Sequence, residues 1–288
     1  MLPDLPAGAA ARAHRCLDSL HSLIYFVPEA EEELTAVGLR PGRMCYFASR
    51  SAAMGPVSAG VTAATFYNFN PTLVARHIPR AWTLASTADI LAARMTAVDR
   101  ALRRLLGDDG IAGPDVAEAA ELARAATAGL LPEGRALYAA HAELEWPGEP
   151  HLVLWQAVTL LREFRGDGHI AALLDADLSG LDALITHTAT GRGFLADAAK
   201  ATRGWSDEEW NAGADDLRSR GLLADDGLTA AGAATRDALE RATDRLGSAG
   251  WHTLGERRLA RLTELGRGLT QRLVGAGAFP SGVFAARK

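Results

Sequence analysis

The chain contains one block of sequence twice. Arg103 to Ala126 aligns without a gap onto Arg220 to Thr243, 117 positions later, and each copy carries Leu-Leu and then Asp-Asp-Gly. An internal repeat of this kind constrains the architecture more strongly than any local signal. The repeat therefore predicts two copies of one helical unit, related by a pseudo-two-fold axis.

Helical spacing dominates the rest of the sequence. Apolar residues recur every three or four positions, for example from His14 to Phe26, and strict alternation is almost absent. Apolar residues make up 48% of the 288 positions, which is enough for a sizeable core. We therefore expect a mainly α protein with two units, residues 1–145 and residues 146–288.

A short hairpin interrupts this helical pattern inside each repeat. In the second copy, Leu222-Leu223 and Leu228-Thr229 flank an Asp-Asp-Gly turn, and a new helix begins at Ala230. Asp-Gly favours a tight hairpin because the turn needs positive φ. Before it, Ser206 and Glu209 form a capping box that opens a helix. A helix, a hairpin and a second helix predict a winged helix here, and the repeat predicts an equivalent wing at Leu105–Ile111.

The stretch from Trp205 to Leu246 resembles winged helices of the multiple-antibiotic-resistance-regulator type. Its motif reads W-S-D-E-E-W, followed by L-R-S-R-G-L-L-A-D-D-G-L-T. Together with the upstream R-E-F-R-G-D-G-H-I-A-A-L, the chain resembles an actinobacterial family of tandem helix-turn-helix proteins. The resemblance implies a tandem winged-helix fold and dimerisation helices after the wings. It also implies a small-ligand site near the junction of the dimerisation helices and the DNA-binding lobe, and we expect that site in a pocket between the two copies.

The charge of the predicted reading helices argues against DNA. The second, Asp207 to Arg220, carries five acidic residues against two arginines, and its wing adds Asp225 and Asp226. A helix that approaches phosphates closely is normally basic. The first, Trp82 to Arg104, has a charge of +2 that Asp108 and Asp109 cancel. We therefore favour a small-molecule-binding protein with lost or weakened DNA binding, and a DNA-binding transcriptional regulator is the alternative.

Two segments with unusual polar or aromatic content could line a ligand pocket. The segment Arg162 to His169 packs two arginines, two acids and a histidine beside two glycines. The segment Phe66 to Pro71 holds aromatic rings and two asparagine amides. Arginine forks bind carboxylates and stack on rings, so we expect a small anionic or aromatic ligand. The alternatives are a structural salt-bridge loop and ordinary core packing. The candidate ligand-binding residues are His21, Tyr25, Arg50, Tyr67, Asn68, Arg162, Arg165, Asp167 and His169.

No sequence motif identifies a reaction. The chain lacks a nucleophile elbow, a phosphate-binding loop, a dinucleotide fingerprint and paired histidines at zinc-ligand spacing. We therefore expect no cofactor and no metal. Whether the protein is an enzyme stays open; a cofactor-free acid–base reaction would use His169, poised by Asp167, with a carboxylate.

The remaining predictions concern location and assembly. No apolar run is long enough to span a bilayer and no signal peptide is apparent, which favours a cytoplasmic protein without a membrane partner. The last predicted helix, Leu254 to Val274, carries a stripe of leucines. That stripe predicts packing on the body of the protein or a homodimer.

Overall fold

The computed structural model describes residues 5–191, 193 and 195–280, and most of them are helical. The first half contains α1 (Ala9–Ser22), η1 (Leu23–Tyr25), α2 (Pro28–Ala36), α3 (Arg43–Ser51), η2 (Ala52–Met54), α4 (Ala59–Phe66), α5 (Pro71–Ala75), η3 (Arg80–Thr83), α6 (Thr87–Leu106), α7 (Asp108–Ile111), α8 (Pro114–Thr127) and α9 (Ala136–Ala142). The second half contains α10 (Pro150–Asp175), α11 (Gly180–Thr188), α12 (Ala196–Arg203), α13 (Asp207–Ser219), β1 (Leu223–Ala224), β2 (Gly227–Leu228), α14 (Ala230–Leu246), α15 (Ala249–Leu254) and α16 (Glu256–Gly275). The prediction of a mainly α protein is confirmed.

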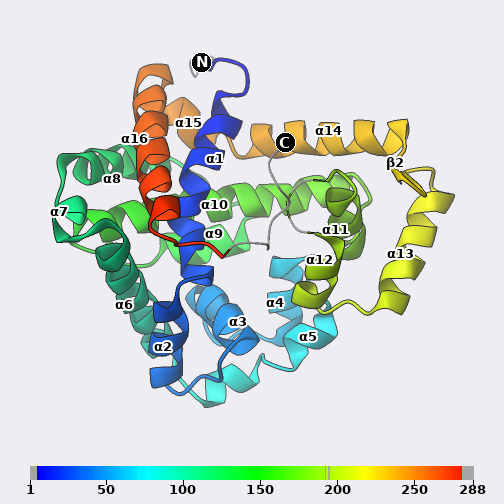
Figure 1. Ribbon diagram of the computed structural model, residues 1–288, viewed down its shortest axis with the longest axis horizontal. Coiled ribbons are helices and arrows are strands. Elements are labelled where there is room, and N and C mark those ends of the chain that lie inside the picture. The colour runs from blue at the N-terminus through cyan, green and yellow to red at the C-terminus, as the bar shows by residue number, and fades with distance from the viewer. Residues whose placement is uncertain (1–4, 192, 194, 281–288) are drawn as a thin grey trace.

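The second predicted wing is present. Ser206 caps α13 through the expected capping box with Glu209, and α13 is followed by the antiparallel pair β1–β2. Gly227 closes the turn with a φ of 141°, a conformation that a side chain would oppose. Figure 1 shows the resulting order of α13, wing and α14 at one end of the molecule.

The first predicted wing is wrong. Leu105 and Leu106 belong to α6, and Asp108–Ile111 forms the short helix α7. One residue explains the difference: Gly107 stands where the second copy has Ala224, and its φ of 75° ends α6 before the two aspartates. Asp108 and Asp109 then occupy the first turn of a helix, where carboxylates are favourable. The described residues therefore hold one two-stranded wing instead of two equivalent wings.

The long helix α10 runs through the middle of the molecule and organises it (Figure 1). It packs against α8, α9, α14, α1 and α6. Eight of the eleven residues from His151 to Leu161 are apolar, and all eleven are buried, including the polar His151, Gln156 and Thr159. Glu163, Asp167 and Gly168 further along the helix are buried as well. Burial all round a helix is typical of a central core element.

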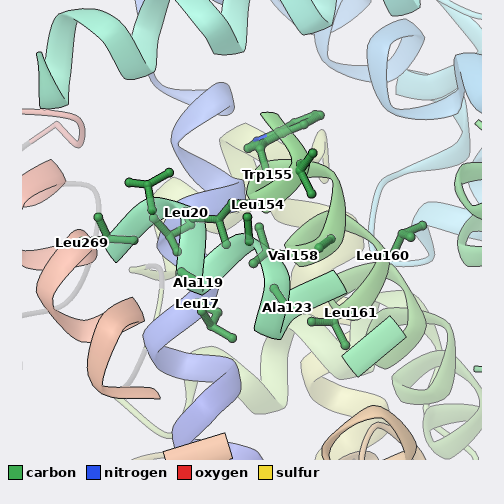
Figure 2. Packing of buried hydrophobic residues seen from close by; sticks show 14 of the residues in the cluster. Leu17, Leu20, Ala119, Ala123, Leu154, Trp155, Val158, Leu160, Leu161 and Leu269 are labelled. Carbon is green, nitrogen blue, oxygen red and sulfur yellow. The ribbon is translucent and has the colours of Figure 1, made fainter. Parts of the chain in front are cut away.

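The largest core cluster combines residues from both halves of the chain. Figure 2 shows Leu17 and Leu20 of α1 and Ala119 and Ala123 of α8 around Leu154 of α10. Two smaller clusters lie among α2–α6 and among α10, α11, α13 and α14. The division into residues 1–145 and 146–288 stays a prediction, but the main hydrophobic core crosses it.

The leucine stripe of the last helix packs within the chain. Leu259, Leu262, Leu265, Leu269 and Leu273 are buried, and α16 lies along α1 and also contacts α8. The leucines of the stripe are therefore used inside the molecule, and a homodimer stays a prediction. Among the described helices, none is long and apolar enough to cross a membrane.

Candidate functional site

A cavity of about 460 Å³ lies where elements from both halves of the chain meet. Its walls come from α1, α3, the α4–α5 connection, α10, α11, α12 and α14. The part of its lining that the structure describes includes five arginines: Arg50, Arg162, Arg165, Arg203 and Arg236. The acids of the same lining are Asp18, Glu163, Asp167 and Glu240. The arginines outnumber these acids by one, so the cavity combines paired charges with a small excess of positive charge.

The cavity brings together most of the candidate residues from the sequence. Those that line it are Arg50, Tyr67, Asn68, Arg162, Arg165, Asp167 and His169. The two predicted segments therefore face one space, although they lie about a hundred positions apart in the chain. His21 and Tyr25 are not part of this lining; Tyr25 lines a neighbouring cavity of about 470 Å³ between α2 and α3. Ligand binding by the set stays a prediction.

Arg50 and Glu163 form a buried ion pair beside the cavity. Nη2 of Arg50 lies 3.2 Å from Oε2 of Glu163, and Nη1 donates to the phenol oxygen of Tyr46 at 2.9 Å. The Arg50 guanidinium also lies 4.4 Å from the centre of the Phe66 ring. Burial would raise the pKa of Glu163, but Arg50 and Arg162 hold it down at about 2. The carboxylate is therefore charged and fixes the Arg50 head group.

Behind this pair, His21 and Tyr25 form a buried hydrogen-bond chain. The hydroxyl of Thr159 donates to the carbonyl of Trp155, so it accepts from Nδ1 of His21 at 2.8 Å. Nε2 of His21 then accepts from the Tyr25 hydroxyl at 2.7 Å. Burial, with Arg162 next in size, lowers the pKa of His21 well below its ordinary value. The imidazole is neutral and supports the site from behind.

His169 is positioned by a threonine. The Thr243 hydroxyl donates to the carbonyl of Leu239, so it accepts from Nδ1 of His169 at 2.8 Å. Burial and Arg165 lower the pKa of His169 to about 4, which leaves Nε2 as an unprotonated lone pair at neutral pH. The expectation that Asp167 poises His169 is wrong. Residues two positions apart on a helix point in different directions, so Asp167 contacts a different partner.

That partner is the start of α9. Oδ2 of Asp167 accepts from the backbone nitrogen of Tyr138 at 2.9 Å, and the side chain is 7% exposed. Burial raises the pKa of Asp167 to about 6 despite this bond. Asp167 therefore titrates within reach of neutral pH in a cavity that it lines.

The two arginines of the predicted segment, Arg162 and Arg165, form ion pairs within the chain. Arg162 donates to Asp18 at 3.0 Å and to Glu163 at 3.1 Å. Arg165 donates to Asp244 at 3.0 Å. The alternative of a structural salt-bridge loop is thus correct in part: Arg162 pairs with Glu163, but Arg165 pairs with Asp244 and not with Asp167. Both guanidinium groups still line the cavity.

The aromatic segment is anchored to the second half of the chain. The Tyr67 hydroxyl donates to the carbonyl of Leu178 at 2.7 Å, and the Asn68 carbonyl accepts from the indole of Trp205 at 2.9 Å. Tyr67 has a φ of 47°, a conformation that is uncommon for a residue with a side chain. These bonds hold Tyr67 and Asn68 at the rim formed by α11.

Several cavity residues, above all Tyr46, were not predicted from the sequence. It lies one helical turn before Arg50 in α3, so the spacing of four between them was a usable signal. Tyr46 lines both cavities. The other missed cavity residues with ionisable side chains include His14, Asp18, Arg203, Arg236 and Glu240, which no local pattern connects to the rest.

The winged-helix end of the molecule is acidic, as expected. The exposed carboxylates of Asp207, Glu208, Asp215 and Asp216 lie on α13. Its Arg218 binds Asp215 and Asp225, and Arg220, which follows the helix, binds Asp182 and Asp216. Both cations are therefore neutralised locally.

The helix expected to read DNA in the first copy is a core helix. α6 buries one face, including Arg94, whose Nη1 donates to the carbonyl of Ser49 at 2.8 Å. Its other arginines form ion pairs within the chain: Arg100 with Glu32 and Glu33, Arg103 with Asp99 and Asp108, and Arg104 with Glu29. Each of these three arginines is therefore paired with a carboxylate of α2, α6 or α7.

Comparison with known proteins gives one match. A family model described as a helix-turn-helix family matches residues 10–280, which is nearly the whole chain. No curated protein and no solved structure matches. The helix, wing and helix of the second half agree with this match. The chain belongs to a helix-turn-helix family.

Proposed function

We propose that the protein binds a small anionic organic compound, of the aromatic carboxylate class, in the 460 Å³ cavity. The supporting observation is the arginine-rich lining, in which the Nε atoms of Arg50 and Arg236 are buried and have no hydrogen-bond partner among the described residues. A buried donor without a partner costs roughly 1–3 kcal/mol, and a shift of the guanidinium group toward an incoming carboxylate would give its Nε a partner.

Aromatic residues in the same cavity walls favour a ligand that contains a ring. Rings of Tyr46, Phe66, Tyr67 and Phe69 line the cavity beside the arginines. Guanidinium groups already stack on two of them: Arg50 on Phe66, and Arg203 on Phe69 at 4.7 Å. A flat ring with a carboxylate fits such a lining, because it stacks on rings while its oxygens accept from the guanidinium forks.

Titration calorimetry with benzoate and its neutral isostere benzamide tests the proposal. Benzoate is expected to bind at least tenfold more tightly than benzamide. In the variant Arg236→Ala the affinity for benzoate should fall, whereas Arg241→Ala, an exposed arginine on the same helix, should leave it unchanged. Equal binding of the two compounds, or no binding of benzoate or other aromatic carboxylates, contradicts the proposal.

A second candidate function is DNA-binding regulation of the multiple-antibiotic-resistance-regulator type. It is favoured by the family match and by the order of α13, wing and α14. The acidic surface of α13 weighs against it, since duplex DNA binding depends on contacts between cations and phosphates. A mobility-shift assay with DNA from the gene's own neighbourhood decides between them. Nanomolar, salt-sensitive binding at physiological ionic strength would place this candidate first.

A further inference from the structure

The buried charges beside the cavity do not balance within the described part of the chain. Arg50 and Arg94 are 9% and 2% exposed, and Glu163, at 2% exposed, is the buried carboxylate that faces them. Arg162 is more open and shares Glu163 with Asp18. His21 and His141 are neutral because burial lowers the pKa of each. Asp167, the other buried carboxylate of the cavity lining, faces Arg135 instead. One buried guanidinium charge therefore lacks a matching carboxylate, and an uncompensated buried charge is strongly unfavourable.

Tyr46 is placed to supply the missing negative charge. Its phenol oxygen accepts from Nη1 of Arg50 at 2.9 Å, and its ring lies 5.5 Å from that guanidinium. The charged and titratable groups around it are Arg43 and Arg50 of α3, Tyr25 of η1, Arg162 and Glu163 of α10, and Arg203 of α12. Glu31 of α2 shares the neighbouring cavity, and its Oε2 accepts from the backbone nitrogen of Gly42.

The balance of these groups lowers the pKa of the Tyr46 phenol. Burial alone would raise the pKa of Tyr46, but Arg50, Arg203 and Arg162 outweigh it and hold the pKa below its ordinary value. Burial is the largest single influence at all four tyrosines, but at Tyr25, Tyr67 and Tyr138 the nearby charges do not outweigh it and the pKa is raised. Tyr46 thus differs from every other tyrosine of the chain in the direction of its shift.

We propose that Tyr46 is the proton-exchanging residue of the cavity: above the pH at which its phenol ionises, its oxygen neutralises Arg50 while the cavity is empty, and it takes up a proton when a carboxylate binds against Arg50. The proton comes from solvent, no covalent bond to the ligand forms, and the negative charge beside Arg50 passes from the phenol oxygen to the carboxylate. Benzoate affinity should therefore weaken as the pH rises through the ionisation of Tyr46. The exchange step rests on the proposed ligand, whereas the ionisation of Tyr46 does not.

The ionisation is tested without any ligand. The near-ultraviolet absorbance of tyrosinate is followed during an alkaline titration of the intact protein. One tyrosine of the four should ionise in a separate step below the ordinary range near pH 10. The step should disappear in Tyr46→Phe and persist in Tyr67→Phe, whose phenol also lines the cavity but donates to Leu178. A titration without a separate step, or a step that persists in Tyr46→Phe, overturns the proposal.

A second variant guards against misfolding of Tyr46→Phe. Arg203→Gln keeps the tyrosine and removes one of the cations that favour its ionised form. The separate step should then move to higher pH, and an unmoved step counts against the proposal.

The exchange step is tested by calorimetry with benzoate in two buffers of different ionisation enthalpy. At a pH above the separate step, the wild-type protein should take up close to one proton per benzoate bound, and Tyr46→Phe should take up none. Binding without proton uptake, or uptake that persists in the variant, overturns the exchange. Failure of benzoate to bind at any pH overturns the proposed function together with the exchange step, while the tyrosine titration still decides the ionisation of Tyr46.

Discussion

The backbone carbonyl of Tyr67 occupies the place where a side chain on Gly180 would begin. A Cβ built on Gly180 would lie 1.9 Å from the Tyr67 oxygen, so the first residue of α11 is in direct contact with the α4–α5 connection. The Tyr67 phenol bonds to Leu178, two residues before that glycine. This contact joins the first half of the chain to the second at the rim of the cavity.

Gly180→Ala should therefore damage both stability and the cavity. The methyl group forces the Tyr67 backbone away, an overpacking cost of about 1–3 kcal/mol, and benzoate affinity should fall with it. Gly268→Ala is the matched control, since Gly268 is exposed in α16 and a Cβ there meets nothing within 4 Å. That control should stabilise the protein by up to ~1 kcal/mol. Urea unfolding and calorimetry measure both effects, and an unaffected Gly180→Ala protein would refute the close contact.

Arg50 and Arg165 should separate structural from ligand-binding roles. Arg50→Met removes one of the two guanidinium groups that bind the buried Glu163 carboxylate, leaving Arg162, and should cost roughly 1–3 kcal/mol of unfolding free energy. Arg165→Ala removes pairs with Asp244 and Glu240, whose side chains are a third to a half exposed, and should cost at most ~1 kcal/mol. The same Arg165→Ala protein should lose at least tenfold in benzoate affinity. A large loss of stability with unchanged binding would instead make Arg165 a structural bridge.

Tyr25→Phe tests the hydrogen-bond chain behind the cavity. The change leaves Nε2 of the fully buried His21 without its donor, which should cost about 1–3 kcal/mol. Tyr67→Phe should cost less, because Tyr67 is only partly buried and solvent can replace its bond to Leu178. Denaturant unfolding compares the two variants. Equal costs would show that His21 recovers a partner when Tyr25 loses its hydroxyl.

Local signals in the sequence predicted local structure well. The Asp-Asp-Gly turn and the Ser206–Glu209 capping box each depend on residues within a few positions, and both form as expected. The same reasoning failed at Asp108, because one glycine before it ends α6 and converts the following turn into a helix. The two copies share a pattern of side chains, but their backbone conformations differ: the first forms a short helix where the second forms the wing.

The sequence indicated which segments line the cavity, because their residue types are unusual, but it did not indicate their hydrogen-bond partners. The segments around Tyr67 and His169 have unusual composition, and they line one cavity. The partners that determine their chemistry could not be read from the sequence. Thr243, which fixes His169, and Tyr138, which binds Asp167, lie on other helices, and only the packing of α9 and α14 on α10 brings them close.

Asp167 gives a prediction with a defined pH dependence. The folded protein holds the proton of this carboxyl up to a pH of about 6, whereas the unfolded chain releases it near the ordinary 3.8. A raised pKa for an acid means that ionised Asp167 destabilises the fold. This cost is fully present above pH 6 and disappears as the pH falls below 3.8.

Asp167→Asn should therefore stabilise the protein at pH 8 and leave it nearly unchanged at pH 4. The amide oxygen can still accept from the Tyr138 backbone, and the removed cost is at most ~3 kcal/mol, since one pKa unit corresponds to about 1.4 kcal/mol. His14, His141 and His169, whose pKa values are lowered, destabilise both proteins alike as the pH falls, so the difference between variant and wild type isolates Asp167. Urea unfolding at intervals between pH 4 and pH 8 measures that difference. A difference independent of pH would mean that Asp167 is ionised throughout and that its burial is compensated by Arg135, the cation that faces it.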